Sequence, residues 1–275
     1  MTAAGRPIPV LVAAIIACAL VVSAAMLLAP SLGAALSGWS LGAQEAVFAL
    51  LLYGVLAICA VIGRRLAALP RANRATLGWI ALGAAIGVGG LLLTLADAAL
   101  AGTVSRGTGG FTASALLLGS LVIVGQSASE ELFFRGWLQP VLARSWSPAV
   151  GILVTAAAFA GLHVAGGART PLTLVNLLLG GILFGLLAWR SSGIAASVAA
   201  HAGWNWSEGI LFGLDPNPGA GSFGAVSDLD LAGPALWGGS AEGLNASIAM
   251  TIVITALVLP LALGGRISSR STAPG

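Results

Sequence analysis

Two adjacent glutamates and an arginine lie in one of the most apolar stretches of the chain, QSASEELFFRGW at residues 126–137. An ionisable group at mid-bilayer costs about 2.5–3.5 kcal/mol on insertion scales, so each charge there needs a partner or a function. Glu131 and Arg135 are four residues apart, in the favourable order for an ion pair on one helix face. Glu130 is turned about 100° away from Glu131 and has no partner in its own helix. The spacing therefore predicts structural support from Glu131 and Arg135, and a separate role for Glu130.

The two histidines of the chain repeat the four-residue spacing. Phe159 and His163 (FAGLH) share one helix face, and so do His201 and Asn205 (HAGWN). Taken singly, a buried histidine is usually a structural hydrogen-bonding group, and an asparagine in a membrane helix often links neighbouring helices. Three helices that present polar faces at the same spacing favour a common cavity instead. We expect Glu130 to meet both histidines and Asn205 there, with Phe159 as structural support.

This set of residues permits two kinds of hydrolysis. A carboxylate beside a histidine, here Glu130 and His163, can hold a water molecule and take its proton. His201 and Asn205 can then donate hydrogen bonds to a developing oxyanion. Alternatively, Glu130, His163 and His201 supply three ligands of a catalytic zinc ion and leave one position for water. Glu208 lies on nearly the same helix face as His201, about two turns farther outward, and is a weaker candidate.

Composition predicts the elements that must position these groups. The chain is 58% hydrophobic and 8% charged, against about 25% charged in a soluble domain, which indicates lipid-facing surfaces. Eight apolar runs are long enough to cross a bilayer. They cover residues 8–29, 44–63, 77–100, 112–139, 148–166, 172–189, 192–212 and 244–264. We predict an all-α polytopic membrane protein, a single domain over residues 1–275 in which about eight transmembrane helices enclose a polar cavity.

Arginine placement predicts the orientation. With the N-terminus in the cytoplasm, nine arginines fall on the cytoplasmic side and only Arg106 and Arg169 fall outside, as the positive-inside rule favours. Both termini are then cytoplasmic. The first apolar run has a core of about 20 residues, longer than a signal peptide requires, so we expect it to be retained. The long connection that begins at Asp215 is rich in Gly, Pro and Asp, which predicts a water-exposed loop.

The sequence argues against several other classes of function and leaves two alternatives open. A net charge of +3, with scattered arginines, gives no indication of nucleic-acid binding. Cys18 and Cys59 both fall within apolar runs, which argues against a disulfide framework.

A proton- or ion-coupled transporter, in which buried Glu and His also form relays, is the main alternative. It predicts discontinuous helices and repeat symmetry. A catalytically idle immunity scaffold is another alternative.

The E-E-x-x-x-R of Glu130, Glu131 and Arg135, the F-x-x-x-H ending at His163 and the H-x-x-x-N starting at His201 resemble the three motifs of the CAAX-protease and bacteriocin-processing family. These intramembrane endopeptidases are related to the CAAX prenyl endopeptidase and to the Abi proteins. The resemblance covers about residues 112–212, which we expect to be the catalytic core.

The resemblance implies an eight-helix bundle whose cavity opens to the cytoplasm. It also implies that Glu130 and His163 activate the water and that His201 and Asn205 form the oxyanion site. Members are described both as metalloproteases and as metal-independent glutamate proteases. The asparagine beside His201 favours the second, with no cofactor; in the first, zinc would be held by the glutamate and both histidines.

The resemblance further implies a peptide or membrane-anchored protein as substrate and the lipid bilayer as surroundings, in a bacterial cell membrane; it does not say whether the substrate is prenylated.

One mismatch concerns the depth of Glu130 and His163 along their helices. His163 lies about 24 Å from a helix start at Ser147, at 1.5 Å per residue. That is farther than Glu130 lies from a helix end at residue 139.

Overall fold

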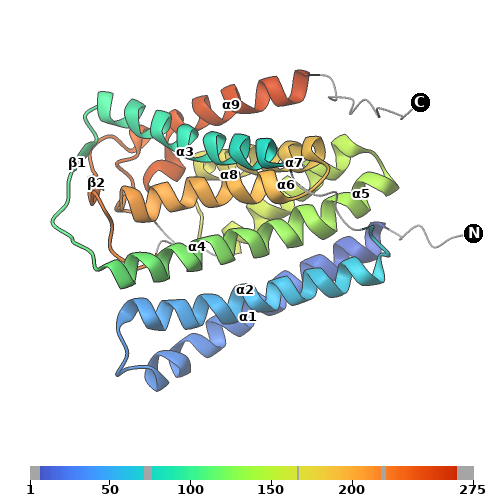
Figure 1. Ribbon diagram of the computed structural model, residues 1–275, viewed down its shortest axis with the longest axis horizontal. Helices are drawn as coiled ribbons and strands as arrows, with labels where there is room; N and C mark the ends of the chain where they lie inside the picture. Colours follow the sequence, from blue (N-terminus) through green and yellow to red (C-terminus); the bar gives the residue numbers. More distant parts are fainter. Residues whose placement is uncertain (1–6, 71–75, 166, 218–220, 265–275) are drawn as a thin grey trace, which may run out of the picture.

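The computed structural model describes residues 7–70, 76–165, 167–217 and 221–264, and most of them are helical (Figure 1). Each of the eight apolar runs forms helix. The elements in chain order are α1 (Pro7–Ala35), α2 (Leu41–Leu66), α3 (Leu77–Leu100), β1 (Val104–Arg106), α4 (Ala113–Phe133), the π-helical η1 (Phe134–Leu138), α5 (Gln139–Ser145), α6 (Pro148–Ala165), α7 (Pro171–Ser191), α8 (Ala195–Trp206), the π-helical η2 (Ser207–Leu211), β2 (Leu229–Leu231), the short 3-10 helices η3 (Ala235–Trp237) and η4 (Gly243–Ala246), and α9 (Ile248–Leu263).

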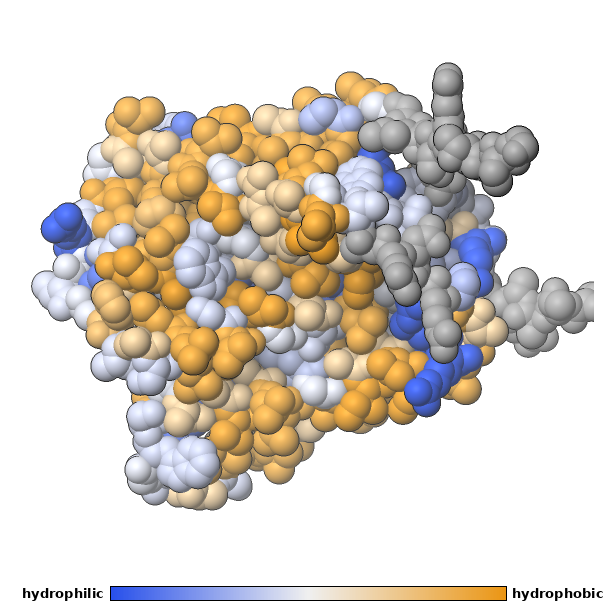
Figure 2. Space-filling model, in the orientation of Figure 1, coloured by the Kyte–Doolittle hydropathy of each residue, from blue (hydrophilic) through white to orange (hydrophobic). Residues whose placement is uncertain are grey.

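Length and composition make the chain a polytopic membrane protein of the all-α class. Within the described part of the chain, α1, α2, α3, α7 and the continuous run Ala113–Ser145 are long and apolar enough to cross a membrane, while α6 and α9 are shorter apolar helices. Figure 2 shows an apolar lateral surface, with strongly hydrophilic residues gathered mainly at the end where both termini lie. That end carries the arginines of α2, α5 and α7.

The fourth span is longer than the sequence predicted. Residues 140–145 continue the helix beyond the expected end at 139. Pro140 follows directly on the π-helical turn η1, and Arg64 donates to the carbonyl of Gly136 that Pro140 cannot reach with an N–H. Glu130 and Ser145 are fifteen positions apart, and so are Pro148 and His163 in the antiparallel α6. Glu130 and His163 thus both lie about 22 Å from the short turn that joins the two helices. The depth mismatch is removed.

Glycines on α3 set the position of α8. A Cβ atom placed on Gly83 would collide with the carbonyl oxygen of Ala196, and one on Gly87 would collide with that of Ala200. The two helices therefore pack backbone to backbone, as small-residue spacings permit in membranes. This contact fixes the helix that carries His201 and Asn205.

The connection after α8 is partly buried, so the prediction of a water-exposed loop is wrong for several of its residues. β2 pairs antiparallel with β1, while Phe223, Ala225 and Leu231 are buried. At the same end of the bundle, the α2 residue Glu45 accepts hydrogen bonds from the backbone N–H and the hydroxyl of Ser222. The connection thereby closes over the end of the bundle opposite the termini.

Candidate active site

The predicted ion pair is present at the end of α4. An Arg135 guanidinium nitrogen lies 2.8 Å from Glu131 Oε1, with both side chains fully buried. A second Arg135 nitrogen donates to the carbonyl of Gly181 on α7, 2.9 Å away. The guanidinium carbon also lies 4.8 Å from the centre of the Phe159 ring, a favourable cation–π distance. The prediction that Glu131, Arg135 and Phe159 form a supporting group is consistent with these contacts.

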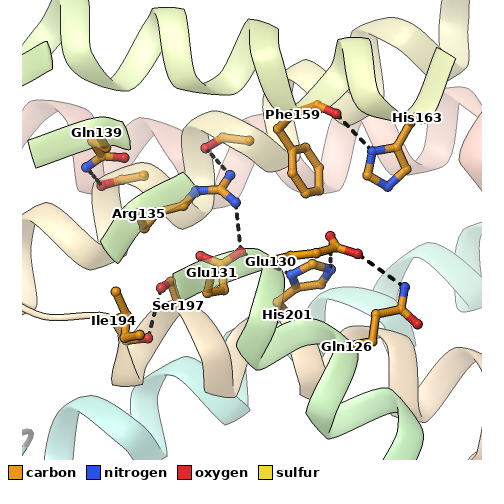
Figure 3. Close-up of polar contacts among 12 residues, drawn as sticks. Gln126, Glu130, Glu131, Arg135, Gln139, Phe159, His163, Ile194, Ser197 and His201 are labelled. Atoms are coloured by element: carbon orange, nitrogen blue, oxygen red, sulfur yellow. Dashed lines mark hydrogen bonds and ion pairs between the residues drawn. The ribbon is translucent and has the colours of Figure 1, made fainter. Parts of the chain in front are cut away.

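Glu131 has a second partner that helix periodicity did not predict. His201 Nδ1 lies 3.0 Å from Glu131 Oε1 (Figure 3). Because the ion pair keeps Glu131 an acceptor, His201 Nδ1 donates this hydrogen bond. The imidazole stacks on Phe184 of α7, with ring centres 4.7 Å apart. The ring is therefore fixed in orientation, and its Nε2 points away from Glu131.

Glu130 lies on the other side of the same imidazole. Its Oε2 is 3.9 Å from His201 Nε2, and its Oε1 accepts a long hydrogen bond of 3.3 Å from Gln126. Among the residues that the structure describes, no hydrogen-bond donor reaches Oε2, although the residue is only 3% exposed. One oxygen of this buried carboxylate is consequently free for another molecule.

His163 lies in the last turn of α6 and is half-buried. Its Nδ1 is 2.9 Å from the carbonyl oxygen of Phe159. A carbonyl can only accept, so Nδ1 carries the proton, and in the neutral ring Nε2 has a free lone pair. This tautomer lets His163 accept a proton or a hydrogen bond from a molecule beside it.

The predicted catalytic residues meet at one cavity of about 870 Å³. Glu130 from α4, His163 from α6 and His201 with Asn205 from α8 all line it, as the sequence predicted for a common cavity. Asn205 is half-buried and has no hydrogen-bond partner among the side chains that the structure describes. α1 and α2 supply a largely apolar wall. The cavity thus joins a polar centre to an apolar surface.

The cavity reaches the loop end of the bundle. The α2 residues that line it all lie between Leu41 and Leu56, and none lies between residues 57 and 66. From the connections, the lining includes Asn217, Gly221, Glu242 and Asn245. The termini lie at the opposite end (Figure 1). Cytoplasmic termini and a cavity that opens to the cytoplasm are therefore incompatible expectations. If the arginine distribution sets the orientation, the cavity faces the outside.

The zinc alternative requires Glu130, His163 and His201 to form a ligand set. Within residues 7–70, 76–165, 167–217 and 221–264, no three His, Cys, Asp or Glu side chains are close enough to hold a metal ion. As arranged, these three residues do not fit a preformed zinc site. A metal measurement decides between the two chemistries.

Sequence reasoning missed two polar neighbours of the site. Gln126 contacts Glu130 from one turn earlier in α4, so the prediction that Glu130 has no partner in its own helix is wrong. The i, i+4 spacing could have indicated this contact. Tyr53 of α2 lines the same cavity, but no local spacing connects α2 to the three motifs. Glu208, one of the weaker candidates, is also a lining residue.

Together, the helical bundle and its buried carboxylate–histidine centre define an intramembrane protein with the chemical groups of a hydrolase. Residues 112–207 match a protein-family model described as type II CAAX prenyl endopeptidase Rce1-like. This match confirms the resemblance to the CAAX-protease and bacteriocin-processing family over that segment, which contains all three motifs. It supports membrane-embedded CAAX-type protease activity in general terms. No curated protein and no solved structure matches the chain.

Proposed function

We propose that the chain is an intramembrane endopeptidase in which Glu130 and His163 activate a water molecule and His201 and Asn205 stabilise the oxyanion, with residues 112–212 as the catalytic core. The observation that carries the proposal is the convergence of these four side chains from three helices on one cavity. The water oxygen attacks the peptide carbonyl while its proton passes to Glu130. The proton then moves to the leaving nitrogen as the C–N bond breaks, so no covalent intermediate forms.

The contacts of the two histidines support different roles for them. His163 donates through Nδ1 to the Phe159 carbonyl, so its Nε2 lone pair can orient the water. His201 donates through Nδ1 to Glu131, so its Nε2 carries a proton only in the imidazolium form. An imidazolium at this position would donate to the developing oxyanion, and the Asn205 amide would supply a second donor.

A metal measurement tests the choice of mechanism. We expect purified full-length protein to retain activity after exhaustive chelation and to carry no stoichiometric zinc by elemental analysis. One zinc ion per chain, with activity lost on its removal and restored on its return, would contradict the glutamate mechanism. Glu130, His163 and His201 would then be assigned as metal ligands.

The position of the site and the family match both support a proposal for the class of substrate. The name of the matching family refers to prenylated CAAX proteins. We propose a peptide or membrane-anchored protein as substrate, because the polar centre is buried beside an apolar wall that can face an anchor.

Quantitative proteomics of membrane-anchored peptides tests this directly. Cells expressing the wild-type chain should accumulate new peptide termini that are missing with Glu130→Gln. Glu45→Gln is the matched control, since both oxygens of Glu45 are occupied by Ser222. Identical termini in the wild-type and Glu130→Gln samples would overturn the proposal and favour a transporter or an idle scaffold.

A further inference from the structure

Glu208 is a buried glutamate of the cavity that has no role in the proposed hydrolysis. Glu208 is the second residue of η2 and lines the same cavity as His201 and Asn205. It is 6% exposed. Within the described ranges of the chain, no side chain or backbone donor contacts its carboxylate. A buried carboxylate without a partner is costly and points to a missing ligand.

The surrounding charges indicate which ligand would bind. Glu45, Glu130, Glu208 and Glu242 line the cavity, and its described lining contains no arginine. The carboxylate of Glu45 accepts hydrogen bonds from Ser222. That of Glu242 accepts hydrogen bonds from the backbone N–H groups of Arg169 and Thr170. Glu130 belongs to the reaction. Glu208 is therefore the carboxylate available to a cation that enters from outside the chain.

The position of Glu208 relates it to the reacting bond. His201, Asn205 and Glu208 follow each other at four and three residues, so they form one stripe along α8 and η2. Seven residues of helix span about 10 Å, which matches about three residues of extended peptide at 3.3–3.6 Å each. The π-helical turn that carries Glu208 is also a feature frequently found at functional sites.

We infer that Glu208 is a specificity-determining residue that binds the ammonium or guanidinium group of a Lys or Arg side chain within about three positions of the scissile bond. This inference rests on the proposed endopeptidase function. It assigns to Glu208 the charge-assisted hydrogen bond that the carboxylate lacks in the free protein.

Membrane-anchored fluorogenic peptides test the inference. Each scanned position carries either lysine or norleucine, which has nearly the same shape and no charge. With full-length protein in a detergent free of amine-bearing lipid, we expect kcat/KM to favour lysine by about 10–100-fold at one position, the usual worth of a hydrogen bond to a charged group. In Glu208→Gln, the lysine-to-norleucine ratio should fall to about one. Glu45→Gln should keep the wild-type ratio.

The ratio is internal to each variant, so a partly unfolded preparation cannot produce the expected result. Binding is measured separately in the Glu130→Gln background, where the labelled lysine peptide should bind more tightly than the norleucine peptide only if Glu208 is present. Cleavage by the wild type without a charge preference, or a preference that survives in Glu208→Gln, would overturn the inference alone. If the wild type cleaves no peptide, the proposed function is contradicted, and the specificity inference fails with it.

Discussion

Glu131 and Glu130 are neighbours in the sequence, but they lie in two regions with opposite chemistry. Glu131 faces a closed network in which Arg135 and His201 both contact one of its oxygens. The Oε2 atoms of both glutamates lack a hydrogen-bond donor among the described residues, but only Glu130 lines the cavity, so only its free oxygen can be reached by another molecule. The closed network holds helices together, while the open side leaves groups free to react. His201 belongs to both regions, because each of its ring nitrogens faces a different glutamate.

The largest expected effect comes from breaking the closed network. Glu131→Leu leaves the fully buried Arg135 guanidinium uncompensated, which typically costs about 3–5 kcal/mol. We expect low yield and a large fall in melting temperature in detergent. The double variant Glu131→Leu with Arg135→Met should recover much of this loss, because it removes both charges. A fully stable Glu131→Leu protein would contradict the structural role of the pair.

Two asparagines sharpen the comparison. Asn205 has no partner among the described residues, whereas Asn176 donates to the carbonyls of Asn245 and Ser247. We expect Asn205→Ala to lower kcat by about 10²–10³-fold, the worth of one oxyanion donor, with an unchanged melting temperature. Asn176→Ala should lower the melting temperature instead. If Asn205→Ala behaves like Asn176→Ala, Asn205 is a structural group rather than an oxyanion donor.

A smaller effect tests how α8 is positioned. A methyl group on Gly87 of α3 would meet the Ala200 carbonyl, whereas one on Gly89 has open space within 4 Å. We expect Gly87→Ala to destabilise the protein by about 1–3 kcal/mol through overpacking and to lower activity by displacing His201. Gly89→Ala is the matched control and should not be destabilised. Thermal unfolding and turnover of the two variants, measured together, check this, and equal behaviour would contradict the close α3–α8 contact.

The sequence predicts well those features that lie within one helix. Apolar runs of about 20 residues predict where the helices form, although α6, α8 and α9 are shorter than the membrane spans expected there. The i, i+4 rule predicts the Glu131–Arg135 pair. Both follow from local geometry, because the rise and twist of a helix decide which residues share a face.

Features that depend on how helices meet were not predicted. The Glu131–His201 contact joins residues seventy positions apart, and periodicity does not say which faces of two helices come together. Spacings such as that of Gly83 and Gly87 arise often by chance among 39 glycines, and only packing shows which of them touch another backbone. Neither π-helical turn was foreseen, since single-turn π-bulges depend on tertiary packing more than on local propensity.

The central claim is that Glu130, which lines the cavity, takes part in the reaction, and that Glu131, which contacts Arg135 and His201, stabilises the fold. Side-by-side turnover and melting temperature of Glu130→Gln and Glu131→Gln in detergent test it most directly. We predict that Glu130→Gln melts like the wild type and loses about 10²–10⁴-fold in turnover, the usual worth of a general base, while Glu131→Gln loses stability first and activity with it. A Glu130→Gln protein with near-normal turnover, beside a folded and inactive Glu131→Gln protein, would contradict the claim.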